Sequence, residues 1–197
     1  MTQKTLYLAS KSPRRLQILK EVCKELGIVV RKFNEKNLEG MKDIEEIRNK
    51  ETPTEYVTRV AMDKAIFSAN QLLKRSKGIK PIICGDTIVC LGDKIFLKPQ
   101  SRSDVVEVLT QLSNQQHKVI TSIVLSIPSP DQNNSFIFHQ INITTKVWFS
   151  KIPMSWIIEY SKTDEPIDKS GSYGIQGRAS IFIKKISGSY SSVVGLP

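Results

Sequence analysis

Six consecutive residues near the N-terminus, Ser10-Lys11-Ser12-Pro13-Arg14-Arg15, place hydroxyl and guanidinium groups at a predicted helix start. They follow the apolar run Leu6–Ala9, which predicts a strand, and they precede apolar residues at helical spacing that stop at Gly27. Ser12 suits the N-cap and Pro13 the first helical position. Two arginines at the positive end of a helix dipole are unfavourable, and a bound phosphate chain would remove the conflict. The alternative is an ordinary capped helix whose arginines are solvated.

A carboxylate interrupts an apolar stretch in the middle of the chain. Asp86 lies between the predicted strands 82–84 and 88–91 and directly follows Gly85. A charged side chain in such a run is costly unless it is paired, binds a metal or lies at a strand end facing a cleft. Gly85 allows a bulge or a close backbone approach that would aim this side chain. Asp86 is therefore either a catalytic or metal-binding carboxylate or a turn residue between two strands.

Further charged residues could complete a site for phosphate chemistry. Lys64 lies in the small-residue stripe of a predicted helix, although lysines in such places usually extend to solvent. Lys98 follows a short predicted strand, and Glu35 carries no local pattern of its own. Phosphate transfer needs cations for the anionic oxygens, carboxylates for a metal ion and a base for the attacking water. The candidate cations are Arg14, Arg15, Lys64 and Lys98, and the candidate carboxylates are Glu35 and Asp86.

The charge balance favours an anionic partner of small size. The formal net charge of the 197 residues is +10, but lysines and arginines are scattered among acids instead of forming a tract. Aromatic residues make up 7% of the chain and are not interleaved with the basic ones, which argues against a nucleic-acid groove. A small phosphorylated substrate fits this pattern better.

Other sequence features point to a cytoplasmic globular protein. No stretch approaches the roughly 20 apolar residues that cross a bilayer, and the N-terminus lacks the layout of a secretory signal, so we expect no membrane partner. The three cysteines, Cys23, Cys84 and Cys90, lie in apolar runs without metal-ligand spacing, which is typical of reduced core residues. His117, which precedes a predicted strand, is more typical of a structural hydrogen-bonding residue than of a catalyst.

The elements that must position these residues alternate between helices and strands. Besides the first helix, helices are predicted from 53 to 72, capped by Thr52 with Glu55 as its capping-box partner, from 103 to 112 and just after 153. Strands are predicted at 28–30, 94–97, 119–127, 136–149 and 180–186 as well, with loops at 34–50 and 164–178. The pattern predicts a mixed α/β fold, a central mixed sheet flanked by helices. We find no repeat and no linker, so residues 1–197 are expected to form a single domain.

The motifs together resemble those of a known family, the Maf proteins, over essentially the whole chain. The motifs occur in the family's order, and they are Ser10–Arg15, Tyr56-Val57 with Lys64-Ala65, Gly85–Val89, Leu97–Pro99, Leu112-Ser113 with His117–Val119, Glu165–Gly177 and Gly188–Pro197. Asn34 departs from the pattern, because many members have an acid before the residue that matches Glu35. Members also usually continue beyond the residue that matches Pro197 into a C-terminal helix.

The resemblance implies a nucleoside triphosphate pyrophosphatase, related in fold to the inosine triphosphatase group, with two lobes around a cleft. Such enzymes use Mg²⁺ or Mn²⁺ and cut between the α and β phosphates; a homodimer is a candidate assembly. The implied phosphate-binding residues are Ser10, Arg14 and Arg15, and the residues implied to line the catalytic cleft are Glu35, Lys64, Asp86 and Lys98. Asp86 would accept the proton of the attacking water, and Glu35 and Asp86 would hold the metal ion.

Three positions match the branch of Maf proteins that acts on dTTP and UTP: Arg14, Thr87 and Gln176. The resemblance therefore implies dTTP, UTP and modified pyrimidine nucleotides as substrates. One alternative is a non-catalytic nucleotide- or nucleic-acid-binding regulator that uses the same basic cleft. Another is a phosphomonoesterase, which would release orthophosphate.

Overall fold

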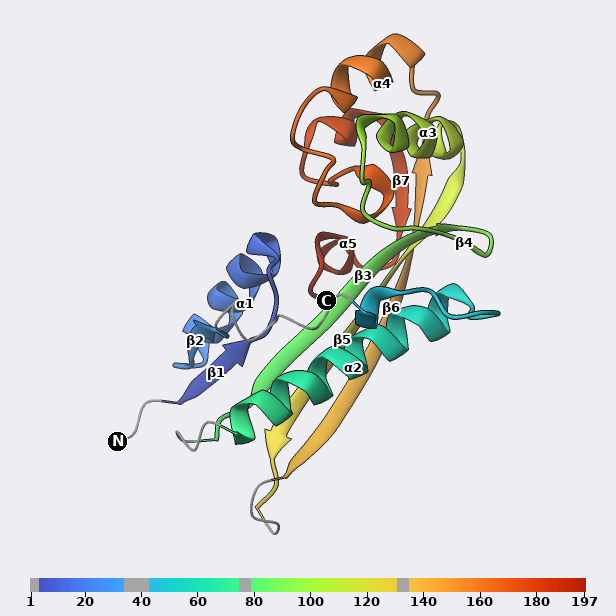
Figure 1. Cartoon of the computed structure of the whole chain (residues 1–197). Helices are drawn as coiled ribbons and strands as arrows, with labels where there is room; N and C mark the ends of the chain where they lie inside the picture. Colours follow the sequence, from blue (N-terminus) through green and yellow to red (C-terminus); the bar gives the residue numbers. More distant parts are fainter. Residues whose placement is uncertain (1–3, 34–42, 75–78, 131–134) are drawn as a thin grey trace.

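A computed structural model describes residues 4–33, 43–74, 79–130 and 135–197. A seven-stranded sheet runs through them in the order β2-β1-β3-β5-β6-β7, with β4 paired to β3 (Figure 1). The elements are β1 (Thr5–Leu8), α1 (Pro13–Glu25), β2 (Val29–Lys32), the 3₁₀ helix η2 (Asp43–Glu45), α2 (Pro53–Leu73), β3 (Ile82–Leu91), β4 (Lys94–Phe96), α3 (Arg102–Leu112), β5 (Gln116–Pro128), β6 (Phe136–Phe149), α4 (Met154–Ser161), the 3₁₀ helices η3 (Ser170–Ser172) and η4 (Arg178–Phe182), β7 (Ile183–Ser187) and α5 (Tyr190–Val194).

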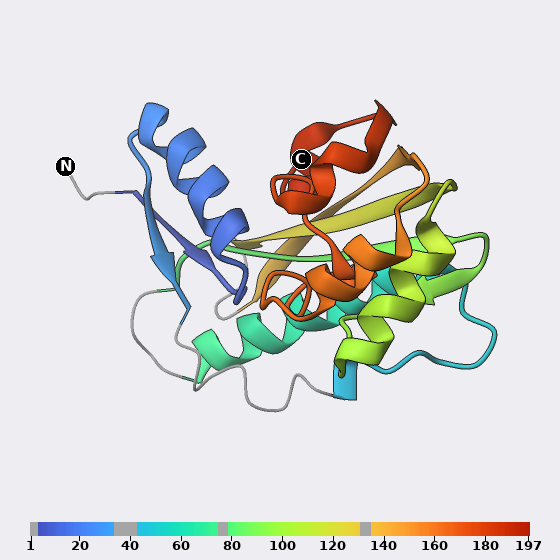
Figure 2. The same cartoon turned by 90° about the horizontal axis from the view of Figure 1, so that it is seen from above.

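The sheet is mixed, which confirms the predicted fold class. Strand β1 is parallel to both β2 and β3, whereas the pairs that involve β4, β5, β6 and β7 are antiparallel. Helices α1 and α5 lie on one side of the long strands and α2 lies on the other (Figure 2). Alternate residues of β3 serve these two sides: Ile83 packs in the cluster with Leu19 of α1, and Ile82 packs in the cluster with Ala61 of α2.

The predicted helix caps are confirmed. The Ser12 side chain accepts a hydrogen bond from the backbone N–H of Arg15, with Pro13 at the first position of α1. Thr52 and Glu55 form a reciprocal capping box at the start of α2. These caps fix where the helices that carry Arg14, Arg15 and Lys64 begin.

The predicted strands 6–9, 28–30, 94–97 and 119–127 differ by one to three residues at their ends from β1, β2, β4 and β5. Three other strand predictions were wrong in their bounds. The predicted strands 82–84 and 88–91 are one strand, β3, because β5 pairs with every residue from Ile82 to Cys90. The predicted strand 180–186 starts only at Ile183, because residues 178–182 form the 3₁₀ helix η4, which buries Ala179. The short helix α5, which Ser189 caps, was not predicted.

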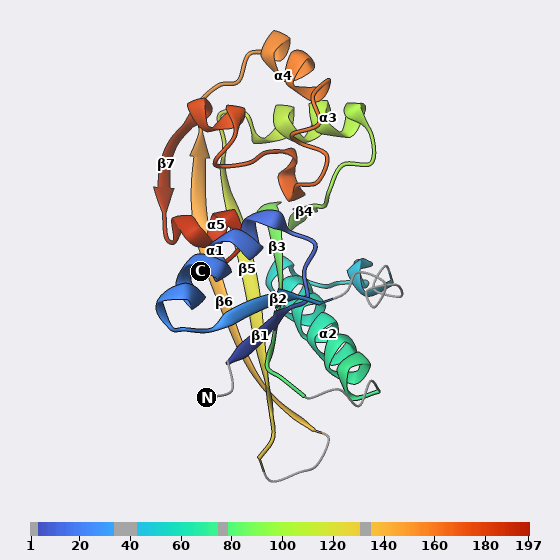
Figure 3. The same cartoon turned by 90° about the vertical axis from the view of Figure 1, so that its left-hand side faces the viewer.

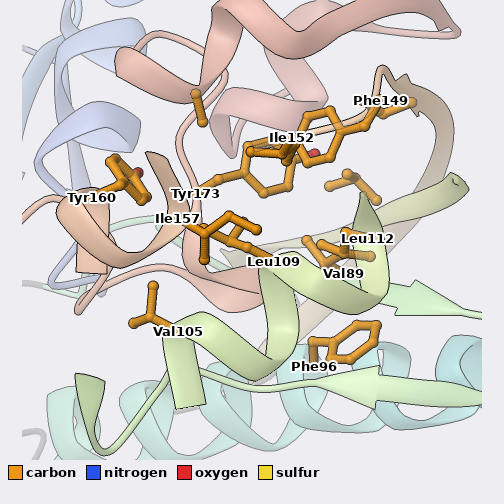
Figure 4. Packing of buried hydrophobic residues seen from close by; sticks show 13 residues of the cluster. Val89, Phe96, Val105, Leu109, Leu112, Phe149, Ile152, Ile157, Tyr160 and Tyr173 are labelled. Carbon is orange, nitrogen blue, oxygen red and sulfur yellow. The ribbon is translucent and has the colours of Figure 1, made fainter. Parts of the chain in front are cut away.

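The largest core cluster lies where α3 and α4 cover the ends of β3, β5 and β6 (Figures 3 and 4). Leu109 and Leu112 of α3 pack there with Val89 of β3 and with Tyr173, which follows η3.

The three cysteines are buried and unpaired, as predicted. Among the residues that the structure describes, no helix combines the length and the apolar character that a bilayer crossing requires.

Candidate active site

One edge of β3 has no strand partner among the described residues over a short stretch between β1 and β4. Strand β1 pairs with β3 only at Ile82 and Ile83, and β4 pairs with it only from Val89 onward. In the described part of the chain no strand covers the edge between these positions. A cavity of about 410 Å³ lies against this edge, which is large enough for a small-molecule ligand.

The cavity has a charged part and an apolar part. Its charged lining consists of Lys11, Arg14, Arg15, Lys64, Lys98 and Lys169 together with Glu45, Asp86 and Asp168. Its apolar lining includes Val89, Val119, Tyr173, Ile175, Val193 and Val194. Three of these, Val89, Val119 and Tyr173, also belong to the core cluster under α3 and α4, so the apolar part has a wall made of packed core residues. A molecule with a polyanionic end and a less polar end would match both parts.

Asp86 and Lys64 form a buried ion pair in this cavity. The Lys64 ammonium, whose side chain is 10% exposed, donates to Asp86 Oδ1 at 2.8 Å. It also donates to Glu45 Oε1 at 2.5 Å. Burial alone would lower the pKa of Lys64, but the two carboxylates outweigh it and raise that pKa above its usual value. Lys64 is therefore a fixed cation and does not extend to solvent.

Glu45 is a cavity residue that sequence reasoning missed. It lies in the stretch 34–50, for which the sequence predicts a surface loop, and its sequence neighbours give no pattern that would single it out. Burial would raise the pKa of Glu45, but the charge of Lys64 and its hydrogen bond lower it. Glu35, the acid that the resemblance implied, lies outside the described residues.

Arg15 is buried, and the protein's own oxygens accept most of its hydrogen bonds. Its Nε donates to Gly195 O at 2.7 Å, and its Nη1 donates to Ser10 Oγ at 2.8 Å and to Gly85 O at 3.0 Å. Its Nη2 donates to Thr87 Oγ1 at 3.2 Å. Four of the five N–H groups of a guanidinium are thereby used. Arg15 lines the cavity, but it also ties the first helix to β3 and to the C-terminal segment.

These bonds reach the residues on both sides of Asp86. Gly85 and Thr87 flank the carboxylate, so the single guanidinium of Arg15 fixes the strand before and after it. The Thr87 hydroxyl also lies 2.9 Å from the Thr121 hydroxyl on β5. Because successive side chains of a strand point to opposite faces, Thr87 faces Arg15 while Asp86 faces Lys64.

The other predicted ligands lie on the cavity as well. Ser10, Arg14, Lys98 and Gln176 all line it, and Lys98 and Gln176 are exposed to solvent. The Arg14 guanidinium is 3.6 Å from a carboxylate oxygen of Asp168. The structure thus brings every predicted site residue that it describes to one cavity.

His117 lies behind the apolar wall and does not line the cavity. Its Nε2 is 2.7 Å from the Tyr173 hydroxyl, and its ring packs edge-on against Phe149. Burial lowers the pKa of His117 to about 4, so the ring is neutral at physiological pH. The prediction of a structural hydrogen-bonding residue is confirmed.

Comparisons with known proteins agree with these motifs. The family model described as Maf-like protein matches residues 5–197.

This chain belongs to the Maf-like family.

Two relatives illustrate the extent of the match. The protein named dTTP/UTP pyrophosphatase of Photorhabdus laumondii is 37% identical to this Maf protein over 198 residues, covering 98% of this chain and 89% of the relative. A protein of the same name from Vibrio cholerae is 36% identical over 197 residues, covering 100% of this chain and 94% of the relative. Among solved structures, a HAM1 protein from Coxiella burnetii superposes with a TM-score of 0.48 at 14% identity, covering 76% of this chain and 75% of the other.

A divalent cation fits the oxygen donors of the Maf cavity. Mg²⁺ is usually held by one or two carboxylates together with phosphate oxygens of the substrate. Asp86 offers such a carboxylate beside the cationic lining. The described residues contain no group of three or more His, Cys, Asp or Glu side chains that could hold a metal ion by themselves. The donors present are compatible with the shared mode, in which phosphate oxygens of a substrate complete the coordination.

Proposed function

We propose that this Maf protein is a nucleoside triphosphate pyrophosphatase that converts dTTP and UTP to the monophosphate and pyrophosphate. The observation that carries the proposal is the Asp86 carboxylate, which lies among the cations of the cavity at the open edge of β3. A site that only bound polyphosphate would gain nothing from a carboxylate beside the anion. Hydrolysis, in contrast, needs an acceptor for the proton of water. The names of the relatives support the same reaction.

In the proposed reaction the triphosphate lies along the charged lining. Arg14, Lys98 and Lys11 neutralise its oxygens, and Lys64 stays beside Asp86. Water adds to the α-phosphorus while the bond from that phosphorus to the α–β bridging oxygen breaks. Asp86 takes the proton of the water, and pyrophosphate leaves with the bridging oxygen.

The proposal includes a divalent cation, Mg²⁺ or Mn²⁺, with Asp86 and Glu35 as its protein ligands. When bound, such a cation neutralises phosphate charge and orients the triphosphate. The protein's own contribution is the placement of Asp86, which Lys64 holds from one side of β3 and which the Arg15 contacts fix through its neighbours.

We further propose that Gln176 reads the base. Its amide offers one donor and one acceptor, which complement O4 and N3–H of uracil and thymine, including 5-modified uracils. Cytosine presents the reverse pattern, a donor at C4 and a bare N3, so an amide held in the orientation that suits uracil would face donor with donor and acceptor with acceptor. Gln176 lies at the cavity beside the buried Ile175, next to the apolar wall. A site whose polar groups are buried against the bound base can discriminate by up to ~10⁴-fold.

A screen of nucleoside triphosphates with separate detection of pyrophosphate and orthophosphate tests the proposed function. We expect pyrophosphate as the primary product, with dTTP and UTP preferred over CTP, GTP and ATP, and we expect Gln176→Glu to erode that preference. Orthophosphate as the sole primary product would indicate the phosphomonoesterase alternative. Tight binding without turnover would indicate the regulator.

A further inference from the structure

We propose that Glu45 is a positioning residue of this active site, held in place by Arg59 and acting on the catalytic chemistry through Lys64. The inference rests on the proposed hydrolysis and concerns a residue outside the motifs that identified the family. The ammonium group of Lys64 has three N–H donors. Two of them bind carboxylates from different elements, Asp86 on β3 and Glu45 on η2.

The backbone around Glu45 is fixed to helix α2 by hydrogen bonds to its carbonyl groups. Arg59 Nη1 donates to Ile44 O at 3.0 Å, and Arg59 Nη2 donates to Glu46 O at 2.9 Å. The Tyr56 hydroxyl donates to the intervening carbonyl, Glu45 O, at 2.8 Å. Three successive carbonyls of a short turn are thus bound by two side chains one helical turn apart.

Arg59 is itself held by acids. It pairs with Glu51 through Nε at 2.5 Å and Nη2 at 2.9 Å, and with Asp63 at 3.4 Å. Its side chain is only 14% exposed. A bidentate Arg–carboxylate pair has a defined geometry, so Arg59 is a rigid support for the turn.

The result is that the Glu45 carboxylate meets the Lys64 ammonium from the solvent side. The Glu45 side chain is 42% exposed, whereas that of Lys64 is 10% exposed. With Asp86 alone, the flexible lysine stem would allow the ammonium to rotate around that carboxylate. With Glu45 as a second acceptor, the ammonium is fixed between the two carboxylates, and one N–H remains for a phosphate oxygen.

Steady-state kinetics of Glu45→Ala, Glu45→Gln and Arg59→Lys with UTP tests this role. We expect Glu45→Ala to lower kcat by about 10- to 100-fold, since small misplacements of reacting groups cost that much, while KM changes less than threefold. Glu45→Gln keeps an acceptor oxygen and should retain more of kcat than the alanine variant. Arg59→Lys should share the kcat loss and add nothing in the double variant with Glu45→Ala. Glu46→Ala is the matched control, because its exposed side chain is removed while its carbonyl remains.

Chemical labelling gives a second readout that needs no turnover. With acetic anhydride and mass spectrometry, Lys64 should label several-fold faster in Glu45→Ala than in the unmodified protein, relative to the exposed Lys98. Unchanged labelling together with unchanged kcat in Glu45→Ala would overturn the proposal. So would an effect on KM alone, or an equal loss in Glu46→Ala. If the unmodified protein releases no pyrophosphate, the proposed function fails, and the labelling result still decides whether Glu45 positions Lys64.

Discussion

At the scale of single residues, two adjacent arginines have different tasks. Arg14 is partly exposed and lines the cavity, whereas Arg15 is buried and donates to four oxygens of the protein. Burial lowers the pKa of Arg15 from its ordinary value. The motif alone could not separate them, because the separation depends on Gly85, Thr87 and Gly195, which are distant in the sequence.

This difference predicts different kinetics for the two positions. Arg14→Ala should raise KM for UTP about tenfold with little change in kcat, because it removes a charge-assisted contact to the triphosphate. Arg15→Lys keeps the charge, but a lysine cannot reach all four acceptors. It should therefore lower both kcat and the melting temperature. The free energy of unfolding should fall by about 1–3 kcal/mol for each buried group that is left unpaired. Kinetics and thermal unfolding of both variants check this. A pure KM effect in Arg15→Lys would assign that residue to the phosphate instead.

Asp86 carries the most direct prediction. Asp86→Asn should lower turnover by about 10²–10⁴-fold, because the amide cannot accept the proton from water. The fold should persist, since Asn keeps the size of the side chain and an oxygen toward Lys64. Pyrophosphate release and nucleotide binding by calorimetry are the measurements. A variant with half of the normal activity and normal affinity would remove Asp86 from the mechanism.

His117 predicts how stability depends on pH. Its pKa falls from 6.5 to about 4 on folding because the ring is buried, so the unfolded chain binds the proton more tightly. The contribution of the neutral ring to the free energy of unfolding is therefore complete above about pH 6.5 and is lost as the pH falls toward 4. At pH 5 the free energy of unfolding is lower by about 2 kcal/mol. Urea unfolding at pH 7.5 and 5.0 should therefore show a smaller drop in His117→Gln than in the unmodified protein. Equal drops would show that His117 does not titrate as described.

At the scale of elements, Gly85 was predicted to allow either a bulge or a close approach of neighbouring groups to the backbone. The close approach is confirmed. There is no bulge, because β3 pairs with β5 in regular register across this position. A Cβ at Gly85 would lie 2.4 Å from Ile123 Cδ1 and 2.8 Å from Ser122 O. Gly85→Ala should therefore destabilise the protein by about 1–3 kcal/mol, as overpacking does. The double variant with Ile123→Val, which removes the Cδ1 atom, should recover part of this loss in a thermal or urea unfolding measurement. No recovery would place the strain on the Ser122 carbonyl.

Local signals predicted most elements well, and long-range pairing decided the rest. The caps at Ser12 and Thr52 depend only on neighbouring residues, so the sequence was sufficient for them. The continuity of β3 through Asp86 depends on pairing with β5, which no local pattern reports. The same limit explains Glu45, whose role depends on Lys64 and on the support from Arg59.

At the scale of the whole molecule, the charge distribution predicts a dependence on salt. The protein has a net charge of +10, and its cavity is lined by more cations than acids. The electrostatic field of the protein should therefore attract a triphosphate. The Debye length falls from about 30 Å at 0.01 M to about 8 Å at 0.15 M salt, so distant charges lose their influence first. With free metal held constant, kcat/KM for UTP should fall by about tenfold over this range, mainly through KM.

Distant substitutions separate this field from direct contacts. Lys20 and Lys24 are exposed on the later turns of α1 and do not line the active-site cavity. Replacing both with glutamate should lower kcat/KM a few-fold at 0.01 M salt and leave it unchanged at 0.15 M, where their charge is screened. Steady-state kinetics at the two salt concentrations is the measurement. An equal loss of kcat/KM at both concentrations would mean that these lysines act on the site through the structure and not through their field. A kcat/KM of the unmodified protein that does not change with salt would mean that local contacts alone attract the substrate.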